Sequence, residues 1–376
     1  MTQPDTLASP RRQLDAIDQQ ILDLLQQRKQ VVDEVIRRKV EQQLPVFVAA
    51  REQEKTQRFR ALALERGLDP EWAEDFLRMI MAASRAAQSS DRFPCATERP
   101  MRLLFVGGEG RMGSLYRQFA QRSGHQVRCL DQHNWYELPA LAEGLDMAIV
   151  CVPIHATEAV IRRLAPKLAP DTVLADFTSN KGDPIRVMLE AHSGPVLGLH
   201  PMHGPDVSNL SRQLMVVSPA RDGEQGQWFA EQCRLWGMRV IEADPQRHDH
   251  VMHLVQGLRH FVALLHGSFM KDYDLKPGDM LDYSSPIYRA ELMMTGRIFS
   301  QSAQLYADIV FANRERRDLL LAFFDHHRKL AALVEANDKA GFVREFEAVT
   351  DFFGSFATQA LEESSYLINR LADRFS

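Results

Sequence analysis

Hydrophobic side chains recur at steps of three and four along residues 11–42, which is the spacing of one face of a long amphipathic helix. A second helical pattern begins near Arg51 and runs to about Arg66, and a third extends from Pro70 to about Ser90. The apolar positions of the first pattern are Leu14, Ile17, Ile21, Leu24, Val31 and Val35. The N-terminal segment is therefore expected to form three helices.

One member of the first apolar stripe is a cation. Arg28 stands seven residues after Ile21 and seven before Val35. A guanidinium in such a stripe costs free energy unless an anion meets it, either a carboxylate of another helix or a bound ligand. Lys39 lies about 20° from Arg28 around the helix and roughly 16 Å along it, so both could reach one small molecule. Arg11 is about 100° off that face, so if it serves a similar site we expect it to reach into that of a neighbouring chain.

After residue 100 the pattern changes to short apolar runs that alternate with helical segments. The apolar runs lie at residues 103–106, 126–131, 147–152, 172–177 and 196–199. Alternation at this spacing predicts a parallel, doubly wound sheet with helices between its strands. The active groups of such sheets lie at the carboxyl ends of the strands.

These patterns predict a multidomain protein. An all-α domain of three helices covers residues 1–92, and the polar run that follows, which contains prolines and lacks periodicity, indicates a linker at 93–100. The α/β domain is expected at residues 101–204. From about residue 223 onward the pattern is almost entirely helical, so residues 205–376 are expected to form an all-α domain that also makes a dimer interface.

A glycine-rich turn follows the first strand of the α/β domain. Gly108, Gly110 and Gly113 form the pattern GxGxxG between a strand and a helix, which places a dinucleotide pyrophosphate on a helix N-terminus. The next strand ends in Asp131, 23 residues after Gly108. A carboxylate there accepts hydrogen bonds from the adenosine ribose and repels a 2′-phosphate, which favours NAD. The further residues expected to line the cofactor are Arg111, Met112, Val152 and Pro153.

Three strand ends of this domain carry polar groups, at residues 151–155, 178–181 and 198–205. His200 closes a strand and enters a loop whose prolines and glycines restrict its direction, so it is the candidate catalytic base. His155 and His203 are more simply explained as hydrogen-bonded bystanders.

The predicted C-terminal domain contains several histidines and two arginines of interest. His248 and His250 are two residues apart and cannot share a helix face, and no motif such as HExxH accompanies them, so no metal site is predicted. Arg289 and Arg297 lie eight residues apart on a helix that begins near a proline. A pair of this kind is usually a solvated face, unless it must hold a carboxylate substrate.

Composition narrows the class of protein. The chain has 376 residues with 45% hydrophobic content and a net charge of −5, which gives no reason to expect nucleic-acid binding. No apolar run approaches the ~18 to 20 residues that span a bilayer, and the N-terminus lacks a signal-peptide core. The four cysteines lie far apart without a CxxC motif, as expected of a cytoplasmic protein.

The polar residues of the N-terminal helices resemble those of the all-helical chorismate mutases, which are intertwined homodimers. The matching positions are Arg11, Arg28, Lys39, Arg51, Glu52, Ser84 and Gln88. The resemblance implies that the arginines hold the two carboxylates of chorismate, that Lys39 and Gln88 donate to the ether oxygen, and that Glu52 accepts from the ring hydroxyl. Val48 departs from the pattern, because some members carry an aspartate there that touches the hydroxyl.

The segments GGEGRMG, LGLHPMHGP, QGLRHF and SSPIYRAELMMTGRIF resemble the prephenate dehydrogenases. Nearly the whole chain is thus similar to the bifunctional chorismate mutase–prephenate dehydrogenases of bacterial tyrosine biosynthesis, with a Rossmann NAD-binding domain between two helical domains. The resemblance implies that His200 takes the proton from the ring hydroxyl of prephenate as hydride leaves the same carbon for NAD, and that Arg297 holds the ring carboxylate. Residues expected to line the substrate or cofactor side are Lys181, His248, His260 and Arg289. Feedback inhibition by tyrosine is also implied, at a site that no residue locates.

Two alternatives remain. The N-terminal domain could be a non-catalytic dimerisation or regulatory module on a working prephenate or arogenate dehydrogenase, or the chain could be a generic dehydrogenase of hydroxy acids. The first is disfavoured because Arg28, Lys39, Arg51 and Gln88 are all present, whereas a pure scaffold would gain stability by replacing the cations of its helix seam with apolar residues. The second is disfavoured because such enzymes usually rely on a lysine in the helical domain, whereas here His200 stands on a strand end. The choice between prephenate and arogenate, and the coupling of the two sites, stay open.

Overall fold

The computed structural model describes residues 7–88, 92–207, 209–273 and 275–375, with the side chains of 86–88 and 372–375 left out of the description. The chain divides into two compact units, Met1–Pro245 and Gln246–Ser376. Each is described by itself.

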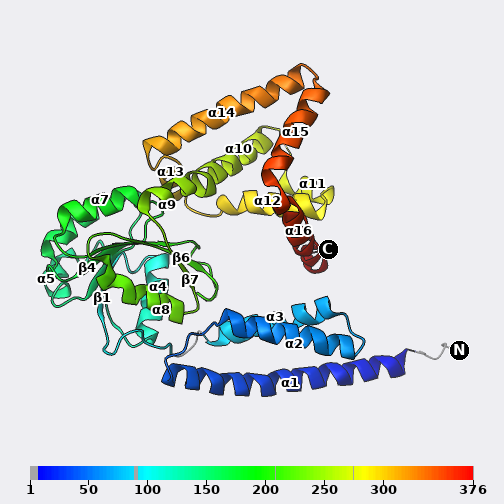
Figure 1. Cartoon of the computed structure of the whole chain (residues 1–376), viewed down its shortest axis with the longest axis horizontal. Helices are drawn as coiled ribbons and strands as arrows, with labels where there is room; N and C mark the ends of the chain where they lie inside the picture. Colours follow the sequence, from blue (N-terminus) through cyan, green and yellow to red (C-terminus); the bar gives the residue numbers. More distant parts are fainter. Residues whose placement is uncertain (1–6, 89–91, 208, 274, 376) are drawn as a thin grey trace. The chain divides into compact units, whose positions relative to one another are not determined.

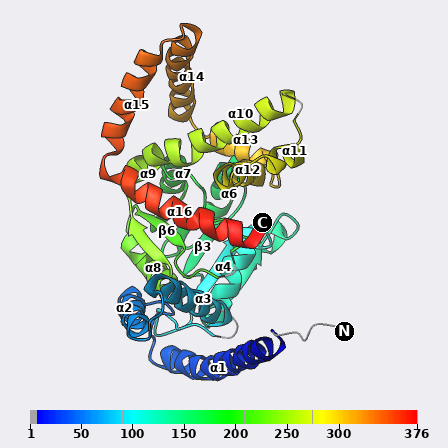
Figure 2. The ribbon, with the colours of Figure 1, turned by 90° about the vertical axis from the view of Figure 1, so that its right-hand side faces the viewer.

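The first unit begins with the three predicted helices, α1 (Ala8–Glu41), α2 (Ala49–Glu65) and α3 (Pro70–Gln88). Helix α2 packs along α3, and α1 also contacts α3 (Figure 2). None of the residues of α1 is buried, although the helix is amphipathic. Leu24 is 63% exposed and Val31 is 62% exposed. The apolar stripe of α1 is therefore left largely uncovered by the described part of its own chain.

A seven-stranded sheet follows in the same unit, with strand order β2-β1-β3-β4-β5-β6-β7. All neighbouring strands are parallel except β5 and β6, which are antiparallel. The strands are β1 (Arg102–Val106), β2 (Gln126–Leu130), β3 (Met147–Val150), β4 (Val173–Asp176), β5 (Val196–Pro201), β6 (Leu214–Pro219) and β7 (Arg239–Glu242). The predicted doubly wound sheet is confirmed, and its central strands are buried as near-continuous apolar runs.

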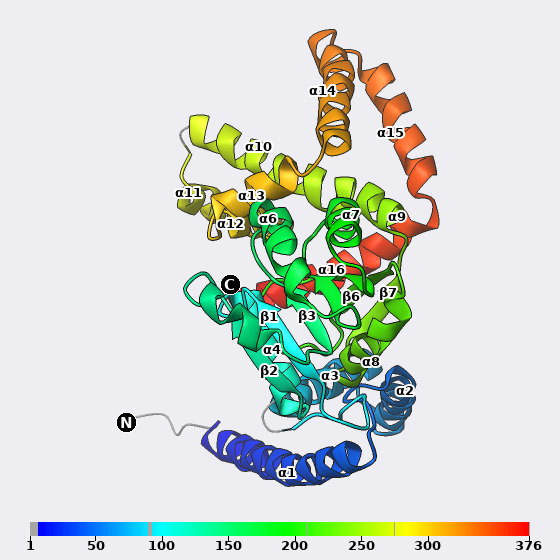
Figure 3. The same ribbon diagram turned by 90° about the vertical axis from the view of Figure 1, so that its left-hand side faces the viewer.

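Helices cover both faces of this sheet (Figure 3). They are α4 (Arg111–Arg122), α5 (Leu138–Leu141), α6 (Ile154–Leu164), α7 (Gly182–Ala191) and α8 (Gln227–Leu235). On one face, Tyr116 of α4 and Phe229 of α8 pack into the apolar core of the sheet. On the other face, Ile161 of α6 and Met188 of α7 do the same. Two separate cores therefore flank the strands and hold their carboxyl ends in place.

Two sequence expectations about this unit are wrong. The domain was expected to end at residue 204, with only helices beyond, but β6 and β7 extend the sheet and the division lies at residue 245. The expected linker at 93–100 docks onto the domain instead. Phe93 is buried in the sheet's core, and the side chain of Gln232 donates to the carbonyl of Pro94 and accepts from the backbone N–H of Ala96, both at 2.9 Å.

The second unit consists of helices, as predicted (Figure 1). Helix α9 spans the boundary between the units, because its first residue, Pro245, is the last residue of the first unit. It continues through a π-helical turn, His253–Leu258, into α10. The helices are α9 (Pro245–Met252), α10 (Arg259–Asp272), α11 (Pro277–Asp282), α12 (Pro286–Ile298), α13 (Ala303–Val310), α14 (Arg314–Glu335), α15 (Lys339–Phe353) and α16 (Ser355–Phe375). No helix among the described residues is both long enough and apolar enough to cross a bilayer.

Candidate active sites

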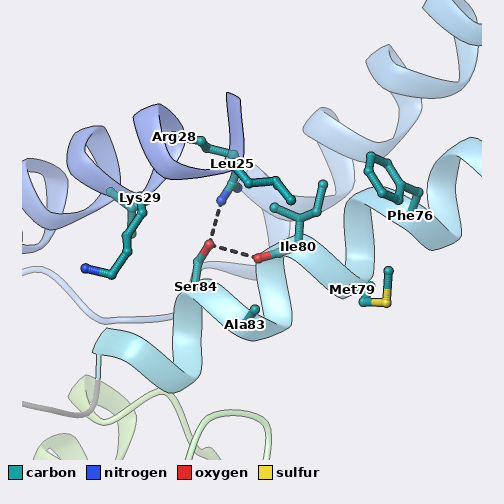
Figure 4. A pocket seen from close by; sticks show the side chains of 9 residues that line it. Leu25, Arg28, Lys29, Phe76, Met79, Ile80, Ala83 and Ser84 are labelled. Atoms are coloured by element: carbon teal, nitrogen blue, oxygen red, sulfur yellow. Dashed lines mark hydrogen bonds between the residues drawn. The ribbon is translucent and has the colours of Figure 1, made fainter. Parts of the chain in front are cut away.

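Arg28 of α1 and Ser84 of α3 meet between the two helices (Figure 4). The guanidinium Nη1 donates to Ser84 Oγ at 2.5 Å, and that hydroxyl donates in turn to the carbonyl of Ile80 at 2.8 Å. Partial burial lowers the pKa of Arg28. Within the described part of the chain its partner is thus a neutral hydroxyl rather than a carboxylate, so the positive charge is left for another anion.

A groove of about 410 Å³ opens beside this pair, within the range of small-molecule sites. Its lining is mainly apolar. The lining residues are Leu25, Arg28, Lys29, Val32, Phe76, Met79, Ile80, Ala83 and Ser84. A ligand with an apolar ring and a carboxylate matches such walls, because the ring would face the aliphatic side chains and the carboxylate would reach the guanidinium.

Lys39 is held by the turn between α1 and α2, and Glu52 is held by two arginines. Lys39 Nζ donates to the carbonyls of Pro45 and Val46, at 3.1 and 2.9 Å. Burial lowers the pKa of Lys39, and the charge of Glu52 acts in the opposite direction. Glu52 itself accepts from the guanidinium of Arg85 and, at 2.5 Å, from that of Arg212.

The remaining predicted mutase residues, Arg51, Arg11 and Gln88, have no described contact with the groove. Arg51 pairs with Glu54 at 2.7 Å on the exposed side of α2. Arg11 lies seventeen residues before Arg28 on the same helix, roughly 26 Å away at 1.5 Å per residue, so it is remote from the groove of its own chain. The side chain of Gln88 lies outside the described residues.

The sequence interpretation missed Lys55, which lies three residues after Glu52 on α2. Burial lowers the pKa of Lys55, the charges of Arg28 and Arg51 lower it further, and Glu52 opposes them. The cations of α1 and α2 therefore share one region of positive potential. The signal that could have found Lys55 is its spacing, since residues three and four apart share a helix face.

The glycine turn after β1 forms a close-packed cradle in front of α4. A Cβ on Gly113 would lie 2.5 Å from the carbonyl oxygen of Gly107, and one on Gly108 would lie 2.6 Å from Cys129 Sγ. Gly107 adopts φ +80°, which favours glycine. Gly110 is the N-cap of α4 and has no side chain that could cap the helix. The first N–H groups of α4 point toward the turn and can therefore bind a ligand. This geometry fits the pyrophosphate of a dinucleotide.

Asp131 follows the end of β2 beside this turn. Its Oδ2 accepts from the backbone N–H of Glu109 at 3.1 Å and from Cys129 Sγ at 3.0 Å, and burial together with Asp131 raises the pKa of Cys129 to about 12. The carboxylate is therefore fixed next to the glycines, where the ribose of NAD is expected. Arg111, at the start of α4, pairs with Asp206 of the loop after β5. Met112, Val152 and Pro153 border the turn on α4 and after β3.

His200 stands near the end of β5 and is 2% exposed. The loop after the neighbouring strand β4 brings Ser179 and Asn180 to the same edge of the sheet, and their Oγ and Oδ1 atoms are buried without a hydrogen-bond partner among the described residues. Orphaned polar atoms beside a buried imidazole, at the carboxyl ends of parallel strands, indicate a site that a polar ligand completes.

Lys181 forms a buried ion pair at the carboxyl ends of β4 and β5. Its side chain and that of Asp176 are both fully buried, with Nζ 2.5 Å from Asp176 Oδ2 and 2.8 Å from the carbonyl of Leu199. The ammonium therefore joins the ends of β4 and β5 next to His200 in the chain, and its expected role in lining the substrate stays a prediction. His203 is also internally satisfied, since its Nε2 lies 2.9 Å from the hydroxyl of Tyr116.

The second unit contains its own cluster of cations and imidazoles. His260 stacks edge-on against Tyr306 with ring centroids 4.9 Å apart, and burial with the charges of Arg259 and Arg316 lowers its pKa to about 4. Burial raises the pKa of Tyr306, while the charges of Arg259 and Arg297 lower it. His260 and Tyr306 are therefore in contact, and the charge of Arg297 acts on Tyr306. Arg289 lies eight residues, or about two turns, before Arg297 on α12, and His248 is buried against Asp249 at 2.8 Å.

Arg316 was not singled out from the sequence. It is fully buried on α14 against Gly257, where a Cβ would lie 2.6 Å from Arg316 Cδ, and its Nη1 donates to the carbonyl of Ile309. Sequence periodicity does not distinguish it from the solvated arginines around it. Among the described residues no group of three or more His, Cys, Asp or Glu side chains could hold a metal ion.

Comparisons with known proteins agree with this division of the chain. Residues 10–89 match the family Chorismate mutase type II, residues 118–239 match Prephenate dehydrogenase, nucleotide-binding domain, and residues 244–348 match Prephenate dehydrogenase, dimerization domain. The chain is 38% identical to a T-protein of Enterobacter agglomerans and 34% identical to one of Haemophilus influenzae, each over 98% of both chains.

Solved structures share the fold of the dehydrogenase part. A prephenate dehydrogenase of A. aeolicus, in complex with hydroxyphenyl propionate and NAD+, has a TM-score of 0.55 at 18% identity and covers 69% of this chain and 100% of its own. An arogenate dehydrogenase of Synechocystis has a TM-score of 0.51 at 17% identity, covering 68% of this chain and 100% of its own.

Proposed function

The chain belongs to the bifunctional chorismate mutase–prephenate dehydrogenases of tyrosine biosynthesis, and we propose how its residues divide the two reactions. It rearranges chorismate to prephenate and then converts prephenate, with NAD, to 4-hydroxyphenylpyruvate and carbon dioxide. The observation that supports the residue roles best is the unsatisfied charge of Arg28 over an apolar groove, together with the buried His200 at the sheet edge.

In the mutase reaction Arg28 and Ser84 bind a carboxylate of chorismate at the groove. Lys39 donates to the ether oxygen, where negative charge grows as the C–O bond breaks, and Glu52 accepts from the ring hydroxyl. Arg51 and Gln88 complete the polar contacts. The reaction needs no nucleophile or proton shuttle, because a pericyclic rearrangement is accelerated by holding the dianion in its reactive conformer and by donors at the developing charge.

A second copy of the chain completes this site. The exposed apolar stripe of α1 has the character of a helix that packs against another helix, and burying it would remove a large hydrophobic surface from water. Arg11 lies too far along α1 to reach its own groove, so in an intertwined homodimer it enters the groove of the partner. The helices of the second unit supply the other dimer contacts, which accords with the dimerization family that matches it.

In the dehydrogenase reaction the glycine turn at 107–113 binds the pyrophosphate and Asp131 binds the adenosine ribose. Bound NAD supplies the acceptor for a hydride. His200 removes the proton of the ring hydroxyl of prephenate, which raises the electron density on the carbon that loses hydride. Arg297 binds the ring carboxylate through its planar fork of donors and keeps it oriented until carbon dioxide leaves. The neutral imidazole of His260, with His248 and Arg289, lines the substrate.

The end product tyrosine inhibits the enzyme, and the chain works in the cytoplasm, where its four free thiols stay reduced. Tyrosine shares the phenol ring and the carboxylate of 4-hydroxyphenylpyruvate, so the same cations can recognise it.

Product analysis of the full chain with chorismate and NAD tests this assignment. The wild-type chain should form 4-hydroxyphenylpyruvate and NADH, whereas His200→Asn should accumulate prephenate without NADH. Arg28→Met should leave chorismate unconsumed yet still oxidise added prephenate. NADH formation by His200→Asn close to that of the wild type would reject the base, and normal chorismate loss in Arg28→Met would reject the assigned role of Arg28. No chorismate loss in the wild-type chain would favour a mutase-like domain that acts only as a scaffold.

A further inference from the structure

The turn between α1 and α2, residues 44–48, docks onto the dehydrogenase domain of the same chain. The backbone N–H of Val46 donates to the carbonyl of Leu235 at 3.1 Å, and the Val46 side chain packs against the core of the sheet. Phe47 lies against Gly237, where a Cβ would be 3.1 Å from Phe47 Cβ. This glycine also has φ +88°, so the close approach and the backbone conformation both require it.

Two guanidinium groups from different domains flank Phe47. Arg85 of α3 lies 6.0 Å from the ring centroid and Arg212, from the loop between β5 and β6, lies 5.0 Å from it. Both arginines also bind Glu52, one at each carboxylate oxygen. The aromatic ring and the carboxylate therefore fix the plane and the direction of each guanidinium.

Arg212 is held in place by its own backbone. It adopts φ +66°, and its N–H donates to the carbonyl of Gly237 at 2.8 Å. The Glu52 side chain is only 17% exposed, whereas that of Arg212 is 44% exposed. The arginine thus reaches from the surface of the dehydrogenase domain to a largely buried carboxylate of the mutase domain.

Lys39 connects to the same turn, because its Nζ donates to the carbonyls of Pro45 and Val46. Lys39, which is assigned to the mutase reaction, therefore contacts a segment that docks onto the dehydrogenase domain, and Glu52 contacts that domain directly through Arg212.

We propose that Arg212 is a positioning residue for the mutase reaction, through which the dehydrogenase domain orients Glu52 toward the ring hydroxyl of chorismate. The inference rests on the proposed role of Glu52. Arg212 touches no substrate in this proposal. Its guanidinium occupies Oε2 and Arg85 occupies Oε1, so the carboxylate is held in one rotamer with lone pairs left for the hydroxyl. Without Arg212 the carboxylate keeps one partner and gains rotational freedom, which misplaces the acceptor.

The test uses three full-length variants, assayed for both reactions in the same preparation. Arg212→Ala should lower the mutase kcat about tenfold with a smaller change in the KM for chorismate, because substrate carboxylates are bound elsewhere, and should leave prephenate oxidation unchanged. Arg212→Lys should restore part of the loss, since an ammonium can still reach one oxygen. Arg234→Ala is the matched control, because Arg234 lies in the same domain in an exposed ion pair with Glu231 and should change neither reaction.

Glu52→Gln separates failure of this inference from failure of the proposed function. If Glu52→Gln retains mutase turnover, the role of Glu52 is wrong. If Glu52→Gln loses turnover but Arg212→Ala does not, Arg212 is not a positioning residue. The double variant Arg212→Ala/Glu52→Gln should lose little more mutase activity than Glu52→Gln alone. A loss equal to the product of the two single losses would overturn the proposal. An equal fall of mutase and dehydrogenase activity in Arg212→Ala would also overturn it.

Discussion

Lys181→Met removes one partner of the buried pair at the ends of β4 and β5, and the structure predicts a large loss of stability. Both side chains are fully buried, and Nζ lies 2.5 Å from Asp176 Oδ2. Without the ammonium, Asp176 remains as an uncompensated buried carboxylate that keeps only the N–H and hydroxyl of Thr178. Removal of one partner of such a pair typically costs about 3–5 kcal/mol, which shifts a urea midpoint by roughly 1–2.5 M for slopes of about 2–3 kcal/mol/M.

Tryptophan fluorescence isolates the relevant transition, because all four tryptophans lie in the first unit, at positions 72, 135, 228 and 236. The double variant Lys181→Met/Asp176→Leu is the matched control. Its urea midpoint should return most of the way to that of the wild type, because the double variant leaves no unpaired charge in the interior. The KM for prephenate should change little in Lys181→Met. An unchanged midpoint together with a KM raised a hundredfold would refute the structural role and return Lys181 to the substrate site.

Three further predictions follow from the sites. Asp131→Ser should raise the ratio of kcat/KM for NADP to that for NAD by about tenfold or more, because the carboxylate that repels a 2′-phosphate is gone; an unchanged ratio would contradict its role. Arg28→Met should lower mutase kcat/KM about a hundredfold with an unchanged or higher urea midpoint, since a cation in an apolar stripe is replaced by an apolar side chain; a lower midpoint that accompanies the loss of activity would argue for a structural role of Arg28. The folded pKa of His260, about 4, lies below the usual value of about 6.5, so the unfolded state binds the proton first. The contribution of neutral His260 to the free energy of unfolding is therefore fully present above about pH 6.5 and is lost as the pH falls toward 4. Protection of α10 from hydrogen exchange should decrease over this range, and the decrease should be smaller in His260→Asn.

Much of the fold could be predicted because its signals are local. The three N-terminal helices follow from spacing along the chain, and the glycine turn needs only a strand before it and a helix after it. Arg28 was recognisable because a guanidinium among the apolar residues of one helix face costs free energy, and those residues can be read from the sequence around it. His200 was recognisable because it ends an apolar run. In each case the neighbours that matter lie within a few residues in sequence.

Other features depend on partners that sequence periodicity does not reveal. β6 is a short apolar run that follows an irregular loop, and only its pairing with β5 and β7 makes it part of the sheet. Lys181 follows β4 and His200 lies near the end of the neighbouring strand β5, so both were plausible site residues from the sequence, and only the structure shows that Lys181 pairs with Asp176.

By itself, the sequence determined the order of the domains, the cofactor turn and the residue types that bind a dicarboxylate, because these depend on local backbone geometry and on the charge of single side chains. The tertiary structure alone decided that Lys181 supports the sheet edge and that Glu52 is held by an arginine 160 residues away. The physical reason is that burial and ion pairing are properties of packed surfaces, which form only when distant segments meet.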